Sequence, residues 1–140
     1  MLLNQVKLDN MAASESLFLS QLSSSPSPLI GDGAMGTLLN SRGVNLDQCF
    51  DALNLSNPNL VMEIHRAYIE AGAQIIQTNT FGANRFKLAA YGLEDSVAQL
   101  NRLGVGLARG TVMAAYKDKG LLVAGDVGPL GVRLAPFGRV

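Results

Sequence analysis

The stretch that decides the fold is Leu29-Ile30-Gly31-Asp32-Gly33-Ala34-Met35-Gly36-Thr37. Two apolar residues lead into a carboxylate held between two glycines, and a helix-compatible run begins at Met35. This order predicts a strand, a tight turn and a helix, with Asp32 at the carboxyl end of the strand. In α/β folds the residues just past the carboxyl ends of strands form the ligand site. A simpler interpretation stays open, in which Asp32 only caps the helix behind it.

Two later stretches repeat this order. Residues 74–77 and 121–124 are short, β-prone apolar runs, and each is followed by glycine and small polar residues, at 78–84 and 125–131. Helical patterns separate the runs, so the order βαβαβ favours a parallel sheet. In a parallel sheet the three polar strand ends lie along one edge. The sequence therefore predicts an α/β fold with a binding site at that edge.

The predicted helices are 16–22, a short one from Met35, 58–71, 84–91 and 94–117, whereas 41–56 reads as a loop that is functional or contains hidden helical turns. The helix from Pro58 has the clearest start, because Asn57 is a good N-cap and proline suits the first helical position. Gly72 is its expected end. His65 is expected to pack within this helix or lie on its surface, since no second histidine exists to share a metal.

The composition excludes several classes of partner. The chain has 140 residues, eleven basic and eleven acidic side chains, and no run of either sign, so neither nucleic acid nor a membrane surface is an expected partner. No apolar run approaches the roughly 18 residues of a membrane span. The lone Cys49 rules out an internal disulfide and favours a reducing, cytoplasmic location. Residues 1–27 are predicted to be a flexible N-terminal extension, and 28–140 the organised domain.

A dinucleotide site is an alternative, because residues 31–36 spell G-x-G-x-x-G. A Rossmann unit also needs a full apolar strand before the glycines and an acidic residue at the end of a second strand. Only Leu29 and Ile30 precede Gly31, and Asp32 would face the pyrophosphate. A phosphate-sugar aldolase-like barrel is disfavoured too, since no lysine occupies a strand end.

Five segments together resemble the homocysteine S-methyltransferase domain, with consistent order and spacing over residues 29–140. They are Asp32-Gly33-Ala34-Met35-Gly36-Thr37, Leu53-Asn54-Leu55-Ser56, Ile64-His65-Arg66-Ala67-Tyr68-Ile69-Glu70-Ala71-Gly72-Ala73, Gln77-Thr78-Asn79-Thr80-Phe81-Gly82-Ala83-Asn84 and Gly125-Asp126-Val127-Gly128-Pro129-Leu130-Gly131. The segment 133–139 looks most like the bifunctional type that joins this domain to a methylenetetrahydrofolate reductase. The homocysteine module of cobalamin-dependent methionine synthase is similar as well.

The resemblance implies the N-terminal portion of a (β/α)8 TIM barrel, about three βα units with parallel strands, and homocysteine as the substrate. By position, Asp32 is expected to bind the ammonium group, and the backbone amides of Gly33 and Ala34 the carboxylate. Asn79 and Thr80 are expected to line the floor beside them. Asp126 stands where relatives often carry a small residue, so no role is assigned to it.

The resemblance also implies a zinc ion that deprotonates the homocysteine thiol, held by one cysteine from a later strand and a Cys-Cys pair near the end of the barrel. This chain has only Cys49, in another place, and an eight-stranded barrel needs about 250 residues. We therefore expect an N-terminal fragment without metal ligands or catalytic residues, inactive alone, with folate or cobalamin among the candidate methyl donors. Two other outcomes stay open: a module that binds an amino acid weakly, and an inert remnant that aggregates through its unpaired strand.

Overall fold

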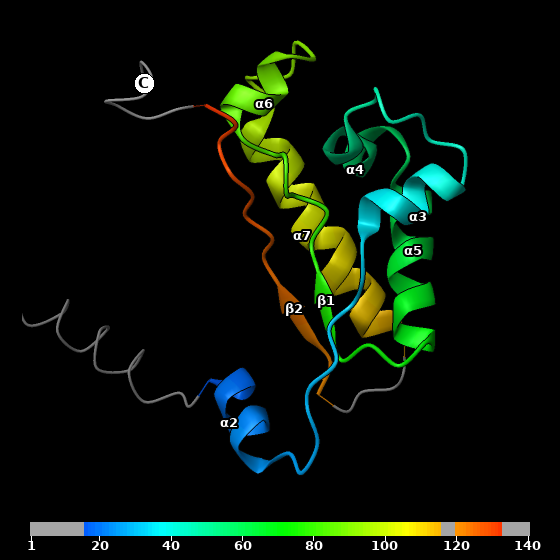
Figure 1. Cartoon of the computed structure of the whole chain (residues 1–140), viewed down its shortest axis with the longest axis vertical. Helices are drawn as coiled ribbons and strands as arrows, with labels where there is room; N and C mark the ends of the chain where they lie inside the picture. Colours follow the sequence, from blue (N-terminus) through cyan, green and yellow to red (C-terminus); the bar gives the residue numbers. More distant parts are fainter. Residues whose placement is uncertain (1–15, 116–119, 133–140) are drawn as a thin grey trace, which may run out of the picture.

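A pair of parallel strands lies at the centre of the fold, with helices packed against it (Figure 1). The computed structural model describes residues 16–115 and 120–132. The elements in chain order are α2 (Leu17–Ser24), α3 (Met35–Ser41), the 3-10 helix η1 (Phe50–Ala52), α4 (Leu53–Ser56), α5 (Pro58–Glu70), β1 (Ile75–Gln77), α6 (Arg85–Ala89), α7 (Val97–Ala114) and β2 (Leu122–Ala124). The predicted extension over 1–27 and the segment 133–139 fall wholly or partly outside the described residues.

The two strands pair in parallel, as the βαβ order predicted. Ile76 lies opposite Val123, and the pairing continues at both ends through backbone hydrogen bonds from Leu122 N to Gln74 O (2.8 Å) and from Thr78 N to Ala124 O (2.9 Å). Both strands therefore end at the same edge, toward α6 (Figure 1). The segments that follow them, 78–84 and 125–131, share that edge.

The predicted first strand is reduced to a single parallel bridge between Gly31 and Ile75. Ile75 N donates to Ile30 O, and Asp32 N donates to Ile75 O at 2.8 Å. In a regular parallel ladder the next bond would run from Gln77 N to the backbone carbonyl of Asp32. Here Gln77 N donates instead to the side-chain oxygen Oδ2 of Asp32 at 2.9 Å. The carboxylate ends the ladder, and the backbone turns away into α3.

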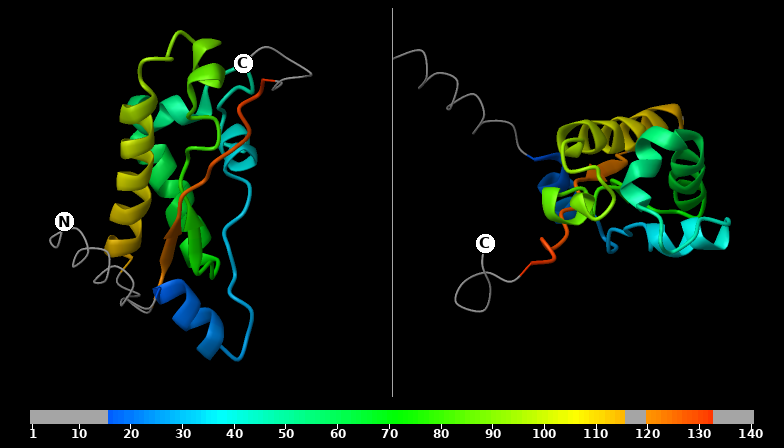
Figure 2. Two further views of the ribbon diagram at one scale, coloured as in Figure 1. Left: turned by 90° about the vertical axis from the view of Figure 1, so that its left-hand side faces the viewer. Right: turned by 90° about the horizontal axis from the view of Figure 1, so that it is seen from above.

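Helices α5 and α7 cover one face of the strands and pack against each other (Figure 2). The core between them and the sheet consists of fully or nearly fully buried side chains: Ile69, Ala73, Ile76 and Ala108. Gln77, the next residue along β1, points to the opposite face and is exposed. A second core cluster joins α3, α4 and α5 through Leu39, Val44, Leu53, Val61 and Ile64.

The predicted start and end of α5 are confirmed. The Asn57 side chain accepts from Leu60 N, Pro58 is the first helical residue, and Gly72 follows α5 with φ of 104°. Elsewhere the boundaries differ. The helix predicted at 84–91 begins at Arg85, because Asn84 is its N-cap, and ends at Ala89. The helix predicted at 94–117 is α7, which begins at Val97, and residues 116 and 117 lie outside the described residues. Asp32 does not cap α3, whose N-cap is Ala34.

Gly104 lets α7 approach the strand ends closely. A Cβ at this position would lie 2.7 Å from Thr80 Cγ2 and 2.8 Å from Asn54 Nδ2, whereas a Cβ at Gly106 on the same helix would meet nothing within 4 Å. We expect Gly104→Ala to destabilise the chain by about 1–3 kcal/mol and Gly106→Ala to stabilise it by up to about 1 kcal/mol. Urea unfolding of both variants measures the difference. Equal effects would contradict this packing.

Candidate functional site

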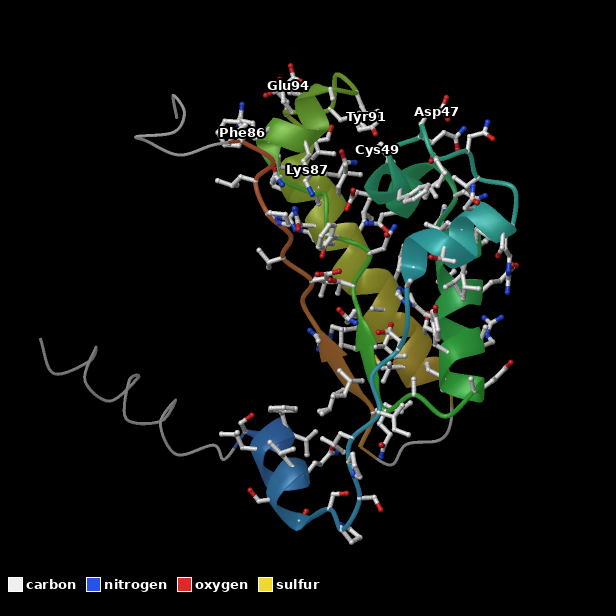
Figure 3. The ribbon with its side chains drawn as sticks, viewed as in Figure 1. Asp47, Cys49, Phe86, Lys87, Tyr91 and Glu94 are labelled. Atoms are coloured by element: carbon white, nitrogen blue, oxygen red, sulfur yellow. The ribbon has the colours of Figure 1, made fainter. Side chains whose placement is uncertain are left out.

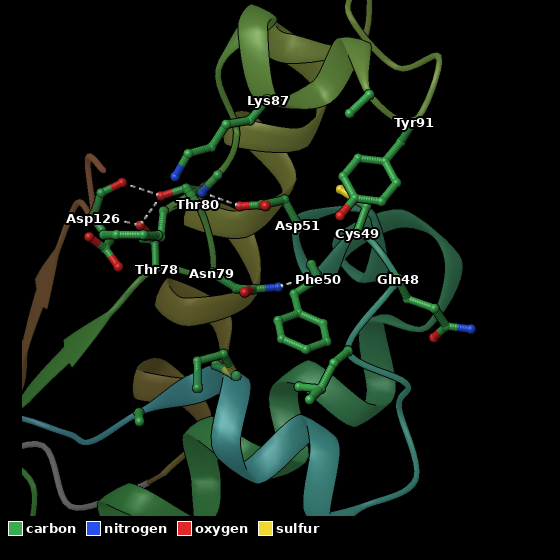
Figure 4. Close-up of a pocket in the computed structure, with 17 residues that line it drawn as sticks. Gln48, Cys49, Phe50, Asp51, Thr78, Asn79, Thr80, Lys87, Tyr91 and Asp126 are labelled. Atoms are coloured by element: carbon green, nitrogen blue, oxygen red, sulfur yellow. Dashed lines mark hydrogen bonds between the residues drawn. The ribbon is translucent and has the colours of Figure 1, made fainter. Parts of the chain in front are cut away.

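A cavity of about 690 Å³ opens at the carboxyl ends of the strands. The segments that follow the strands, the start of α3, the 46–51 loop and α6 line it. Figure 3 shows Asp47, Cys49, Lys87 and Tyr91 at this end of the molecule, and Figure 4 shows the lining side chains. The lining includes three charged residues and three aromatic residues: Asp51, Lys87, Asp126, Phe50, Phe81 and Tyr91.

Asp32 lies beside this cavity but does not line it. Its Oδ2 accepts from Gln77 N at 2.9 Å and its Oδ1 accepts from Gln77 Nε2 at 3.0 Å. Burial raises the pKa of Asp32, the negative charge of Asp126 raises it further, and the Gln77 hydrogen bonds lower it. The ion pairs found among the described residues join Arg42 to Glu63 and Arg85 to Asp95, so no basic side chain neutralises this carboxylate there.

The amides of Gly33 and Ala34 follow Asp32 directly. Within the described part of the chain neither N–H has a hydrogen-bond acceptor, as expected for residues just ahead of a helix. The Tyr68 hydroxyl donates to Ala34 O at 3.3 Å, and a Cβ at Gly33 would lie 2.9 Å from the same hydroxyl. A side chain at position 33 would therefore force the Tyr68 hydroxyl to move, whereas glycine leaves it in contact with the Ala34 carbonyl.

Thr78, Thr80 and the backbone of Asp126 form a closed ring of hydrogen bonds. Asp126 N donates to Thr78 Oγ1 (3.0 Å), the two hydroxyls lie 2.6 Å apart, and Thr80 Oγ1 donates to Asp126 O at 2.8 Å. Since the Thr80 hydroxyl has a single proton, Thr78 must donate to Thr80. The ring joins the ends of β1 and β2 and occupies the Thr80 hydroxyl (Figure 4).

Asn79 and Asn54 form a second buried network beneath the cavity. Asn79 Nδ2 donates to Phe50 O (2.8 Å) and to Asn54 Oδ1 (3.0 Å). Asn54 Nδ2 donates to Asn79 O (2.7 Å) and to Leu100 O (3.2 Å). Both side chains are buried, and the network fixes η1 and α4 against the end of β1 and against α7.

Asp51 is a buried carboxylate in the cavity wall, exposed by only 8%. Its Oδ1 accepts from Gly82 N at 2.9 Å. Burial raises the pKa of Asp51, and the nearby positive charge of Lys87 opposes this shift. The Lys87 ammonium lies 4.5 Å from the centre of the Phe81 ring, which is cation–π distance. Burial also raises the pKa of the Cys49 thiol, so this cysteine is not an activated nucleophile.

The structure brings Ala34, Asn79 and Thr80 together in the cavity wall, with Asp32 and Gly33 next to it. Asp51 and Lys87 were not expected from the sequence as cavity residues, and no role was expected for Asp126, which also lines the cavity. Lys87 could have been found, because the Asn84 cap fixes its place in the first turn of α6. No sequence signal identified Asp51, which lies in the apparent loop.

The homocysteine S-methyltransferase family profile matches residues 29–139, most of the chain. The chain belongs to the homocysteine S-methyltransferase family. This places the cavity and the Asp32 turn in the domain of a methyltransferase family. The match includes residues 31–36, whose G-x-G-x-x-G spacing had suggested a dinucleotide site, so this segment belongs to the methyltransferase domain.

Similar proteins agree with this assignment. The chain is 36% identical to a methionine synthase of Mycobacterium tuberculosis and 37% identical to one of Mycobacterium leprae, each over an alignment of 118 residues. Each alignment covers 79% of this chain and 10% of the methionine synthase. The metallated form of the homocysteine methyltransferase MmuM from Escherichia coli has 35% identity and a TM-score of 0.72, covering 83% of this chain and 42% of that one. The chain thus spans less than half the length of these members of the family.

The residues present do not fit the three-cysteine zinc centre that the resemblance to the homocysteine S-methyltransferases implies. The sequence contains one cysteine, Cys49. Within 16–115 and 120–132, no three His, Cys, Asp or Glu side chains come close enough to hold a metal ion. We therefore derive no step through zinc for this chain. Across the same ranges, no helix has the length and apolar character to cross a membrane.

Proposed function

We propose that this chain binds the amino acid end of homocysteine as part of a homocysteine S-methyltransferase. Asp32 binds the ammonium group, and the amides of Gly33 and Ala34 bind the carboxylate. The observation that carries the proposal is the arrangement of the Asp32 carboxylate next to the Gly33 and Ala34 amides. Among residues 16–115 and 120–132 the carboxylate has no basic partner and the two amides have no acceptor. A zwitterionic amino acid head supplies both missing partners, a cation and an anion.

The cavity gives the rest of the ligand a place. It begins at Ala34, so a side chain attached to a head group at Asp32 would extend between Ala34 and the Asn79–Thr80 segment. The hydrogen bonds of Asn79 Nδ2 and Thr80 Oγ1 are internal. These residues therefore act on the ligand mainly by shaping the cavity floor, as buried and rigid supports.

For the whole enzyme we propose a (β/α)8 TIM barrel, with 1–27 as an N-terminal extension and 28–140 as the first part of the barrel. The strand–helix–strand order, the shared polar edge and the uncovered face of β1 support this arrangement. The single cysteine supports a cytoplasmic, reducing location. The similarity to methionine synthases supports the homocysteine module of such an enzyme as the second candidate.

We infer that the 140 residues alone do not transfer methyl groups. A free thiol has a pKa of about 8.5 and is mostly protonated at neutral pH. The resemblance implies a zinc ion that deprotonates the thiol, and this chain has one cysteine where that site needs three. Folate and cobalamin remain candidate donors for a complete enzyme. Methionine formation by the purified chain would contradict the inference.

Replacing Asp32 by Asn should abolish measurable homocysteine binding, with an affinity loss of at least about a hundredfold. The ion pair with the ligand ammonium is lost, while the shape of the side chain is kept. Isothermal titration calorimetry with L-homocysteine under reducing conditions measures the effect. Asp47→Asn is the control, because Asp47 is an exposed carboxylate at the same end of the molecule. Equal binding by wild type and Asp32→Asn would refute the proposed role of Asp32.

A further inference from the structure

Within the described residues, the two hydrogen bonds that other residues donate to the Asp32 carboxylate both come from Gln77. The Gln77 backbone N–H donates to Oδ2, and the Gln77 side-chain amide donates to Oδ1 at 3.0 Å. The two residues are 45 positions apart in the sequence. Each carboxylate oxygen is thus held by one donor, and the plane of the carboxylate is fixed relative to β1.

The orientation of the Gln77 amide follows from the chemistry of its partner. An ionised carboxylate only accepts hydrogen bonds, so the NH₂ group and not the carbonyl of Gln77 must face it. A carboxylate has about four acceptor positions. The two bonds from Gln77 leave the remaining positions of Asp32 for a ligand.

The other titratable groups near Asp32 do not stabilise its negative charge. Asp126, which follows β2, adds a second negative charge, and Tyr68 on α5 is close enough that Asp32 raises the pKa of its hydroxyl. The neutral donors of Gln77 are therefore the principal support of the ionised carboxylate from outside its own residue. A basic residue in that place would compete with a ligand cation, whereas an amide does not.

We propose that the Gln77 side chain is a positioning residue, which holds the Asp32 carboxylate in the orientation that binds the ammonium group of an amino acid. This inference rests on the proposed function of Asp32. It assigns to the end of β1 a role in ligand binding that is separate from strand pairing, because the side-chain amide takes no part in the ladder.

Gln77→Met tests the inference, since methionine keeps the length of the side chain and the backbone donor but removes the amide. Gln74→Met is the matched control. Gln74 precedes β1 and also holds the 30–32 segment, through Ile30 N donating to its Oε1 at 3.1 Å. The hydrogen bonds to the Asp32 side chain in the described structure come from Gln77 and not from Gln74. Two readouts are needed: carbon-13 NMR titration of the Asp32 carboxyl group and calorimetric binding of L-homocysteine.

We expect Gln77→Met to raise the pKa of Asp32 by about one pH unit and to weaken homocysteine binding about tenfold. Gln74→Met should change neither. Gln77→Glu, which keeps the shape but presents a second carboxylate, should raise the pKa of Asp32 further. An Asp32 titration that Gln77→Met leaves unmoved, or that Gln74→Met moves equally, overturns the inference with the proposed function intact. A wild-type chain that binds no homocysteine overturns the proposed function itself and the role in ligand binding with it.

Discussion

Lowering the pH from 7 to 4 is expected to decrease the free energy of unfolding by about 3 kcal/mol through the protonation of His65. This histidine on α5 is fully buried, and neither ring nitrogen has a hydrogen-bond partner among the residues that the structure describes. Burial lowers its pKa from 6.5 to about 4. The unfolded chain therefore binds a proton at a pH where the folded chain does not, so stability falls as pH decreases through this window and is fully present above pH 6.5.

The comparison of wild type with His65→Leu isolates this contribution. Leucine has a similar volume and cannot be protonated, so the variant should lack the loss between pH 6.5 and 4. Burial raises the pKa of Asp32 and Asp51, and these carboxylates favour folding as pH falls, but they are present in both chains. Urea unfolding at several pH values gives the difference. Parallel pH profiles for the two chains would contradict the burial of an uncharged His65.

Replacing Asn54 by Leu should destabilise the chain by about 2–4 kcal/mol. Asn54 is 1% exposed. Its Nδ2 donates to Asn79 O and Leu100 O, and its Oδ1 accepts from Asn79 Nδ2. Leucine keeps the approximate volume but leaves Asn79 with an unpaired buried carbonyl and one unpaired amide hydrogen. The cavity floor beside Asn79 should loosen as a consequence.

Asn59 provides the control for this substitution. It is an exposed residue in the first turn of α5, so Asn59→Leu should change the free energy of unfolding by less than about 0.5 kcal/mol. Urea unfolding at pH 7 compares the two variants. If Asn54→Leu is as stable as Asn59→Leu, the buried amide network does not hold α4 against β1.

The sequence predicted the elements whose signals are local. Asn57 and Pro58 indicated the start of α5, and the short apolar run at 74–77 indicated β1. Both could be predicted because capping and strand propensity act over a few residues. The predicted first strand is only a single bridge in the structure. Its pairing ends at a hydrogen bond between Asp32 and Gln77, which are distant in the sequence, so no local pattern could predict it. The positions of η1 and α4 within the 41–56 segment could not be predicted, because helices of three and four residues are too short to show a hydrophobic period.

The candidate site could be predicted only in part. Strand ends that carry Gly and small polar residues located the edge and marked Asp32, Asn79 and Thr80 for comparison with a known family. The burial of Asp51 and the hydroxyl ring that uses the backbone of Asp126 depend on tertiary packing. Neither produces a sequence pattern, so both required the structure.

The most direct test of the central claim is a two-dimensional ¹H–¹⁵N NMR titration of the chain with L-homocysteine. The account predicts the largest amide shift changes at Gly33 and Ala34, because their N–H groups gain a carboxylate acceptor that they now lack. The same titration of Asp32→Asn should leave these amides unmoved. Shift changes confined to other segments, or none at Gly33 and Ala34 at saturating ligand, would contradict the account.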